Sequence, residues 1–134
     1  MNRIVKYSYL TKPGMIGTLE VRNRVVMAPM GSGLAELGYP GDRIIQYYKR
    51  RAAGVGLLII ESSYVVPVPG VKVGHLSLAS DTHLEAWRQL VSEIHQAGAA
   101  VGVQIQHPEG RHQRFLRAIC LQLLPLLSRH QLVK

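Results

Sequence analysis

Three aliphatic segments of the sequence are each followed by small or polar residues that could contact a ligand. These residues are Ala28-Pro29-Met30-Gly31, Glu61-Ser62-Ser63 and Gln104-Ile105-Gln106-His107. If the aliphatic segments form parallel strands, their carboxyl ends lie at one edge of the sheet, where α/β proteins bind their ligands. These residues are therefore the candidate binding site, and ordinary strand-to-loop transitions are the alternative explanation.

A glycine pair, Gly31 and Gly33, follows the first aliphatic segment and partly matches the dinucleotide-binding pattern G-x-G-x-x-G. The third glycine position of this pattern is occupied by Glu36, and about ten residues separate the strand from the next helix. The tight turn that would place a helix N-terminus on a pyrophosphate is therefore missing. We do not expect a Rossmann-type nucleotide site.

Neither a metal site nor a serine nucleophile is expected. His107, Glu109 and His112 are close in sequence but lack a recognised ligand spacing. Ser62 is not part of a G-x-S-x-G elbow. Cys120 is the single cysteine, which excludes an internal disulfide and any site that needs several cysteines.

The hydrophobic pattern places these candidate residues on an α/β fold. Continuous apolar runs over residues 25–30, 57–60 and 99–105 predict buried strands. Pro29 cannot donate to a strand ladder, so the first strand should end near it. Amphipathic helices are predicted between them, one capped by Asp42 and the other by Asp81 or Thr82, with Gly98 ending the second. Residues 15–21 predict a short hairpin before the first strand. Strands that alternate with helices indicate a parallel sheet.

The basic charge is concentrated at the end of the chain. The whole sequence of 134 residues carries a net charge of +8, but residues 1–110 contain 11 basic and 8 acidic residues. Residues 111–134 contain five basic residues and no acidic one, and their leucines predict a helix broken by Pro125. No apolar run reaches the ~18 residues of a membrane span, and the polar start does not resemble a signal peptide. We therefore expect a cytoplasmic protein with no nucleic-acid or membrane partner.

An ordered set of segments resembles the N-terminal part of the Old Yellow Enzyme family of NADH:flavin oxidoreductases, which includes 2,4-dienoyl-CoA reductase-like enzymes. The set spans residues 10–111, about four-fifths of the chain. Its segments are Pro13 with Ile16-Gly17-Thr18-Leu19, Asn23-Arg24-Val25-Val26-Met27-Ala28-Pro29-Met30, Tyr47-Tyr48, Arg51-Ala52, Gly56-Leu57-Leu58-Ile59-Ile60-Glu61, Gln104-Ile105-Gln106-His107 and Gly110-Arg111.

This resemblance implies a (β/α)8 TIM barrel that binds FMN at the carboxyl ends of its strands. NAD(P)H would reduce the FMN, which would pass a hydride to an activated alkene such as an enone or enoyl substrate. Small residues allow the backbone to approach a flat ring, and a carboxamide can both donate and accept hydrogen bonds. The resemblance assigns cofactor contacts to Ala28, Pro29, Met30, Gly31, Ser62 and Gln104, with Gln104 at the pyrimidine edge of the flavin.

The same resemblance implies that the chain is an incomplete barrel. A (β/α)8 barrel needs about 200 residues or more, and the family's substrate-binding and proton-donating residues come from later strands, so no catalytic residue is assigned. The family's His-x-Gly-Arg motif is one residue longer in this sequence, which reads His107-Pro108-Glu109-Gly110-Arg111. We expect about three βα units in residues 1–111 and an inactive chain.

Residues 112–134 are expected to be a non-homologous basic, leucine-rich tail produced by a shifted reading frame. Nucleotides that encode Gln122-Leu123-Leu124-Pro125-Leu126-Leu127 can read Ala-Val-Ala-Pro-Ser in another frame, and the family commonly has such a stretch after its Gly-Arg. The alternatives are a non-catalytic fragment that docks onto another chain, and a tail that binds a membrane surface or nucleic acid.

Overall fold

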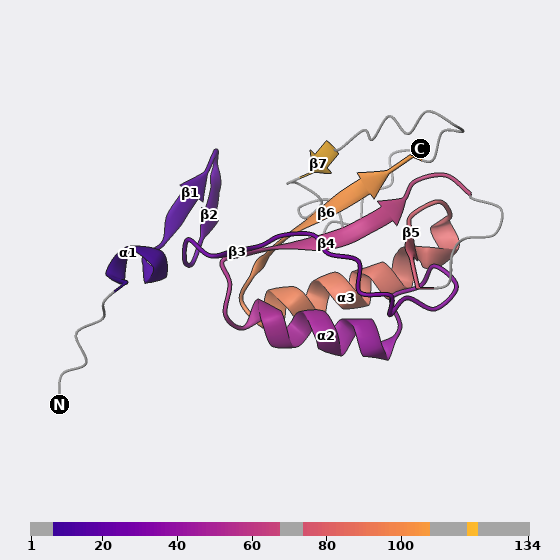
Figure 1. Cartoon of the computed structure of the whole chain (residues 1–134), viewed down its shortest axis with the longest axis horizontal. Helices are drawn as coiled ribbons and strands as arrows, with labels where there is room; N and C mark the ends of the chain where they lie inside the picture. The colour runs from indigo at the N-terminus through magenta and orange to yellow at the C-terminus, as the bar shows by residue number, and fades with distance from the viewer. Residues whose placement is uncertain (1–6, 68–73, 108–117, 121–134) are drawn as a thin grey trace, which may run out of the picture.

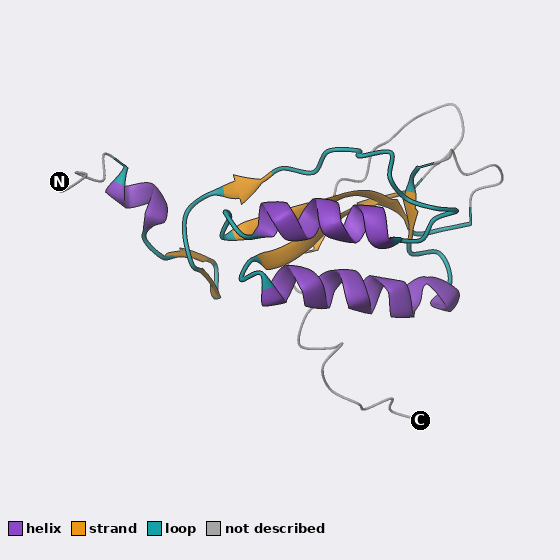
Figure 2. Cartoon of the chain, turned by 90° about the horizontal axis from the view of Figure 1, so that it is seen from below, coloured by secondary structure: helices purple, strands orange, loops and turns teal. Residues whose placement is uncertain are grey.

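The computed structural model describes residues 7–67, 74–107 and 118–120, and its centre is a parallel sheet with two helices against one face (Figure 1, Figure 2). Strands β3 (Val26–Met27), β4 (Leu57–Tyr64) and β6 (Ala100–Gln106) are neighbours in that order and parallel. Helix α2 (Asp42–Ala52) connects β3 to β4, and α3 (Leu84–Gln96) connects β4 to β6. The predicted alternation of strands and helices is confirmed.

Short elements surround this centre. The predicted hairpin is present, with Gly17 at φ 59° in its turn, a left-handed conformation that suits glycine. The other short elements are α1 (Ser8–Thr11), the hairpin strands β1 (Gly14–Ile16) and β2 (Leu19–Val21), β5 (Leu76–Ser77), which pairs with the end of β4, the 3₁₀ turn η1 (Asp81–His83), and β7 (Ala118–Cys120), which pairs antiparallel with β6.

Several local predictions were wrong. The first strand begins one residue later than predicted and covers Val26–Met27, and it ends two residues before Pro29, near which its end was predicted because proline has no N–H to donate. Helix α2 has Gly41 at its N-cap, without a side-chain cap. Ser80 caps η1 by accepting a hydrogen bond from the Thr82 N–H, so α3 begins one turn later than expected. Strand β5 was not predicted.

The tail contains a strand where a helix was predicted. Ala118–Cys120 pairs with β6 in an antiparallel register that sets Ile119 opposite Gln104. The free backbone groups at the edge of β6 provide the hydrogen-bond partners that make a strand favourable here. The other residues of the tail lie outside the described part of the chain.

The hydrophobic core lies between the sheet and the two helices. Successive residues of a strand point to opposite faces, so every second residue of β4 and β6 reaches this core. Its main members are Leu58, Ile60, Val101 and Val103 from the sheet, and Ile44, Ile45, Tyr48, Ala52, Trp87, Leu90, Val91 and Ile94 from the helices. A smaller cluster on the other face joins Leu57 and Ile59 to Val21 of the hairpin.

Arg22 connects the C-terminal ends of both helices. Its guanidinium donates hydrogen bonds to the carbonyl oxygens of Ala52 at 2.5 Å, Val55 at 3.0 Å and Ala97 at 3.2 Å. These carbonyls have no partner within a helix, and the negative end of the helix dipole favours a cation there. Gly98 adopts φ +90°, and a side chain at this position would begin 2.6 Å from an Arg22 nitrogen. The positive φ favours glycine here, and a larger residue would also displace the end of the Arg22 side chain.

We predict that Arg22→Ala lowers the free energy of unfolding by about 1–3 kcal/mol, because three carbonyl oxygens lose a charged donor. Chemical denaturation of the full chain measures this change. Arg43→Ala is the matched control, because Arg43 is exposed on α2 and makes no side-chain hydrogen bond within the described residues. Equal losses for the two variants would contradict this role of Arg22.

Candidate functional site

The structure places the predicted site residues at the carboxyl ends of three neighbouring parallel strands. Residues 28–31 follow β3, Ser62 lies near the end of β4 and Gln104 lies near the end of β6. Strand β4 lies between the other two. The predicted residues are therefore brought to one edge of the sheet, although no hydrogen bond within the described residues joins Gln104 to Ser62.

Two carboxamides project from β6 on the face opposite the helices. Val103 is buried in the core and Ile105 packs against it, so the alternating residues Gln104 and Gln106 lie on the other face. Both are half-buried. The hydroxyl of Ser62 donates a hydrogen bond of 2.5 Å to Oε1 of Gln106. Sequence reasoning gave Gln106 no specific role, but its two-residue spacing from Gln104 was the signal that could have found it.

The segment after β3 presents its backbone and an exposed side chain. The side chain of Met30 is 63% exposed, so packing at the end of the strand does not explain this residue. Among the described residues, no heavy atom beyond the adjacent ones lies within 4 Å of the point where a Gly31 side chain would begin. Ala28 is exposed and Pro29 half-buried. This strand end is accessible to a flat ligand.

A β-bulge in β4 sets the directions of Glu61 and Ser62. The register pairs Ile60 with Val103 and then Ser63 with Ile105, so Glu61 and Ser62 together face the single residue between Val103 and Ile105. The extra residue allows Glu61 to reach α2 while Ser62 reaches the face opposite the helices. Bulges commonly redirect side chains next to functional sites.

Glu61 and Tyr48 form a buried, reciprocal pair of hydrogen bonds. Their exposed fractions are 1% and 0%. The Tyr48 hydroxyl donates to Oε2 of Glu61 at 3.0 Å and accepts from the Glu61 backbone N–H at 2.9 Å. The same Oε2 accepts a second hydrogen bond from the Ser32 backbone N–H at 3.0 Å. The carboxyl group thus connects α2, β4 and the segment after β3.

Burial raises the pKa of Tyr48 well above its ordinary value of 10.0. Backbone hydrogen bonding from Glu61 acts in the opposite direction, and the nearby carboxyl group adds to the increase. The hydroxyl therefore stays protonated and remains a donor to Glu61.

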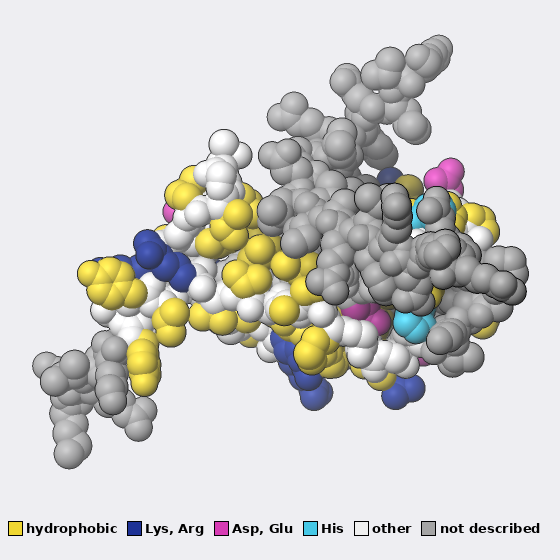
Figure 3. Space-filling model, turned by 45° about the horizontal axis from the view of Figure 1, so that its top comes forward, with side chains coloured by type: hydrophobic (Ala, Val, Ile, Leu, Met, Phe, Trp, Pro, Cys, Tyr) yellow, Lys and Arg dark blue, Asp and Glu magenta, His cyan; other side chains and the backbone are white. Residues whose placement is uncertain are grey.

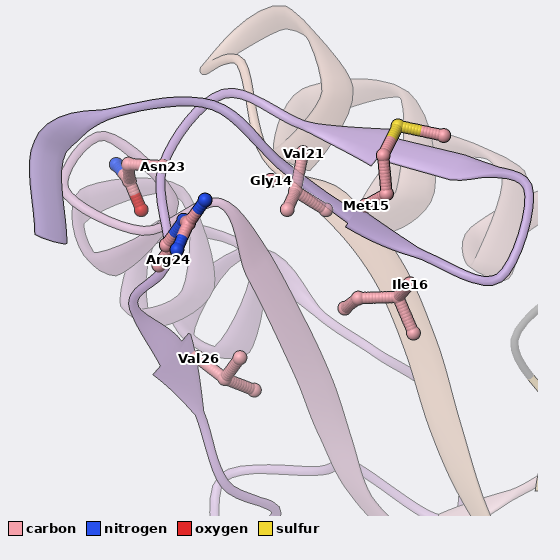
Figure 4. Close-up of a pocket in the computed structure, with 7 residues that line it drawn as sticks. All are labelled: Gly14, Met15, Ile16, Val21, Asn23, Arg24 and Val26. Atoms are coloured by element: carbon pink, nitrogen blue, oxygen red, sulfur yellow. The ribbon is translucent and has the colours of Figure 1, made fainter. Parts of the chain in front are cut away.

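A second surface feature lies at the opposite, amino-terminal end of the strands. A pocket of about 350 Å³ opens between the hairpin and the start of β3 (Figure 4). It is lined by Gly14, Met15, Ile16, Val21, Asn23, Arg24 and Val26. Hydrophobic side chains gather over this part of the molecule (Figure 3). The pocket contains none of the predicted site residues.

Two other sequence expectations concern metals and membranes. Of the histidine cluster, only His107 belongs to the described residues, and Glu109, Arg111 and His112 lie outside them. Within the described part of the chain, no three His, Cys, Asp or Glu side chains come together as metal ligands. None of the described helices has the length and apolar character required to cross a membrane.

Solved structures of Old Yellow Enzyme type share this fold. The old yellow enzyme from Trypanosoma cruzi superimposes with a TM-score of 0.66 at 31% identity, over 75% of this chain and 27% of that chain. Morphinone reductase superimposes with a TM-score of 0.63 at 29% identity, over 72% of this chain and 25% of that chain. The described strands and helices are therefore part of a TIM barrel, and they do not themselves close into a barrel.

The sequence identifies the family. A model of the NADH:flavin oxidoreductase / NADH oxidase family matches residues 9–116, and the chain belongs to this family. The NADH oxidase of Thermoanaerobacter brockii is 41% identical over 73% of this chain and 16% of its own length. The NADPH dehydrogenase of Bacillus subtilis is 33% identical over 73% of this chain and 30% of its own length. The chain thus spans less than a third of these relatives. The family uses FMN with NAD(P)H as the reductant.

We predict that Tyr48→Phe makes stability less dependent on alkaline pH. In the wild type, Tyr48 ionises only after unfolding, so the free energy of unfolding falls as the pH rises above 10.0. This single group contributes up to about 1.4 kcal/mol per pH unit to that decline. Denaturation curves recorded at increasing pH measure the slope, which should be shallower in the variant.

Tyr9→Phe is the matched control for this measurement, because it removes the same hydroxyl from an exposed side chain. It should leave the slope of the wild-type curve unchanged. A Tyr48→Phe curve parallel to that of the wild type would show that Tyr48 ionises in the folded state.

Proposed function

We propose that this chain supplies the first FMN-facing part of an NAD(P)H-dependent oxidoreductase of the ene-reductase type. Its substrate would be a small molecule with an activated alkene, such as an enone or an enoyl compound. Family membership supports the class of reaction. The observation that carries the proposal is the shared edge of the sheet, where the exposed backbone at residues 28–31 and the polar residues of β4 and β6 follow three successive parallel strands.

The residues at this edge fit a flavin. The carboxamide of Gln104 can donate to and accept from a pyrimidine edge, and it makes no side-chain hydrogen bond within the described residues. The accessible backbone at Gly31 suits the approach of a flat ring. His107 adds a buried Nδ1 atom that has no hydrogen-bond partner among the residues that the structure describes. When bound, FMN would transfer a hydride from NAD(P)H to the alkene. We assign its contacts to Ala28, Pro29, Met30, Gly31, Ser62 and Gln104.

The 134-residue chain alone is proposed to bind FMN weakly and not to turn over. The comparison of lengths supports this proposal, because the chain spans 16% of the NADH oxidase and 30% of the Bacillus subtilis NADPH dehydrogenase. In a TIM barrel the site is built from the ends of several strands and the phosphate site from the last loops. A cytoplasmic location and the absence of nucleic-acid or membrane partners stay predictions.

We also propose that residues 112–134 are a frame-shifted tail rather than part of the barrel. The absence of acidic residues and the leucine-rich composition support this reading. The family model matches residues 9–116, so the first five residues of this proposed tail, 112–116, also fall within the family match. Sequencing the DNA of the locus tests the proposal: the rest of the barrel should follow in another frame, and no such open frame would contradict it.

We predict weak, saturable FMN binding by the purified chain, with a dissociation constant of roughly 0.1–1 mM. Gln104→Ala should weaken this binding about fivefold, as expected for one lost hydrogen bond. Quenching of flavin fluorescence measures the affinity, and absorbance of the nicotinamide measures NADPH oxidation, for which we expect no turnover.

Gln89→Ala is the control for the FMN titration, because Gln89 is exposed on α3, away from the strand ends. It should bind FMN as the wild type does. Absence of any saturable binding, or equal binding by the Gln104 and Gln89 variants, would overturn the proposed cofactor site. Stoichiometric flavin with NADPH oxidation would instead overturn the proposed inactivity of the chain.

A further inference from the structure

We propose that Glu61 is a positioning residue that fixes the FMN-facing segment after β3, and that Tyr48 in turn orients Glu61. This inference rests on the proposed function, because it concerns the same edge of the sheet. It gives a specific role to Glu61, which the sequence placed only among the candidate residues at a strand end, and to Tyr48, to which the sequence assigned no role in the site. Neither residue needs to touch the cofactor, since both act through the backbone of residues 28–32.

The first argument is the route of the chain after β3. Backbone pairing of β3 with β4 ends at Met27 and Leu58. From there to Ser32, no described hydrogen bond connects the segment to the rest of the protein, and Met30 and Gly31 are not packed. The bond from the Ser32 N–H to the Glu61 carboxyl, at 3.0 Å, is therefore the first fixed point after the strand. Its position determines where residues 28–31 lie.

The second argument is the cost of burying a carboxyl group. Glu61 is 1% exposed, and neither of the ion pairs described in the structure includes it. A buried polar group without partners is destabilising by several kcal/mol, whereas an apolar residue would not be. Two hydrogen bonds to the carboxyl group, from the Tyr48 hydroxyl and the Ser32 backbone N–H, compensate for this cost. An acidic residue is thus explained by what it binds rather than by core packing.

The third argument is the bulge. The additional residue in β4 sends Glu61 toward Tyr48 and leaves Ser62 free to bond Gln106. Without the bulge, alternation would reverse these directions. One irregularity therefore fixes the strand end after β3 and, through Ser62, the carboxamide of Gln106 on β6. This combination is what a flat ligand spanning the three strand ends requires.

Amide hydrogen exchange at Ser32 tests the proposal on the full chain without any cofactor. Glu61→Met removes the acceptor with little change in length, and exchange at Ser32 should accelerate roughly tenfold. Glu61→Gln keeps one oxygen that can accept both bonds, so it should restore slow exchange. Tyr48→Phe leaves Glu61 in place without its orienting hydroxyl and should give an intermediate rate. Amides of β6, such as that of Val101, should be unaffected.

Glu93→Gln is the matched control, because it removes a carboxylate that pairs with Lys49 between the helices, at 2.6 Å. It should leave exchange at Ser32 unchanged. Unchanged Ser32 exchange in Glu61→Met, or equal acceleration at Ser32 and Val101, would overturn the positioning role. If Glu61→Met does not fold, Tyr48→Phe decides, since wild-type exchange at Ser32 in that variant would also overturn it.

FMN titration of the same variants separates this inference from the proposed function. Affinity should fall about tenfold in Glu61→Met and return in Glu61→Gln. Exchange that responds while neither wild type nor variants bind FMN would contradict the cofactor proposal and leave the positioning of the strand end supported. FMN affinity that is equal in all variants would overturn the link between Glu61 and the site.

Discussion

The buried contact between Tyr48 and Glu61 is the interaction on which the two layers of the fold depend. A carboxyl group in the core is tolerated only with hydrogen-bond partners, and α2 supplies one in a hydroxyl that burial keeps protonated. The reciprocal bond from the Glu61 backbone fixes the same hydroxyl from the strand side. Helix and strand therefore cannot shift relative to each other without breaking both bonds.

The two ends of the sheet have different tasks. At the amino-terminal end, Arg22 binds the carbonyl oxygens with which α2 and α3 terminate, and Gly98 gives it room. At the carboxyl end, Glu61 binds the backbone of the segment after β3 and Ser62 binds the carboxamide of Gln106. This division agrees with barrels in general, where stability is concentrated at one end and ligand chemistry at the other. The pocket beside the hairpin belongs to the first end.

The sequence predicted the elements whose signals are local. The alternation of strands and helices was predicted from continuous aliphatic runs, amphipathic spacing and Gly98. The edge of the sheet that carries the candidate residues was predicted from the residues that follow each strand. The bulge at Glu61 and Ser62 escaped prediction because a simple alternation of side chains assumes an unbroken register. Ser80 was missed because a 3₁₀ turn precedes α3. The role of Tyr48 depends on its hydrogen bonds to Glu61 in the following strand. Helical periodicity marks Tyr48 only as a buried position, so it cannot distinguish such a bond from apolar packing.

Strand β7 has a consequence for how the sheet can grow. It runs antiparallel to β6, with Ile119 opposite Gln104. In a barrel of alternating strands and helices, each new strand starts at the amino-terminal edge and runs parallel to its neighbour. One edge of β6 can accept only one partner, so the antiparallel strand and a fourth parallel strand exclude each other. Any additional barrel unit that joins β6 must first displace residues 118–120.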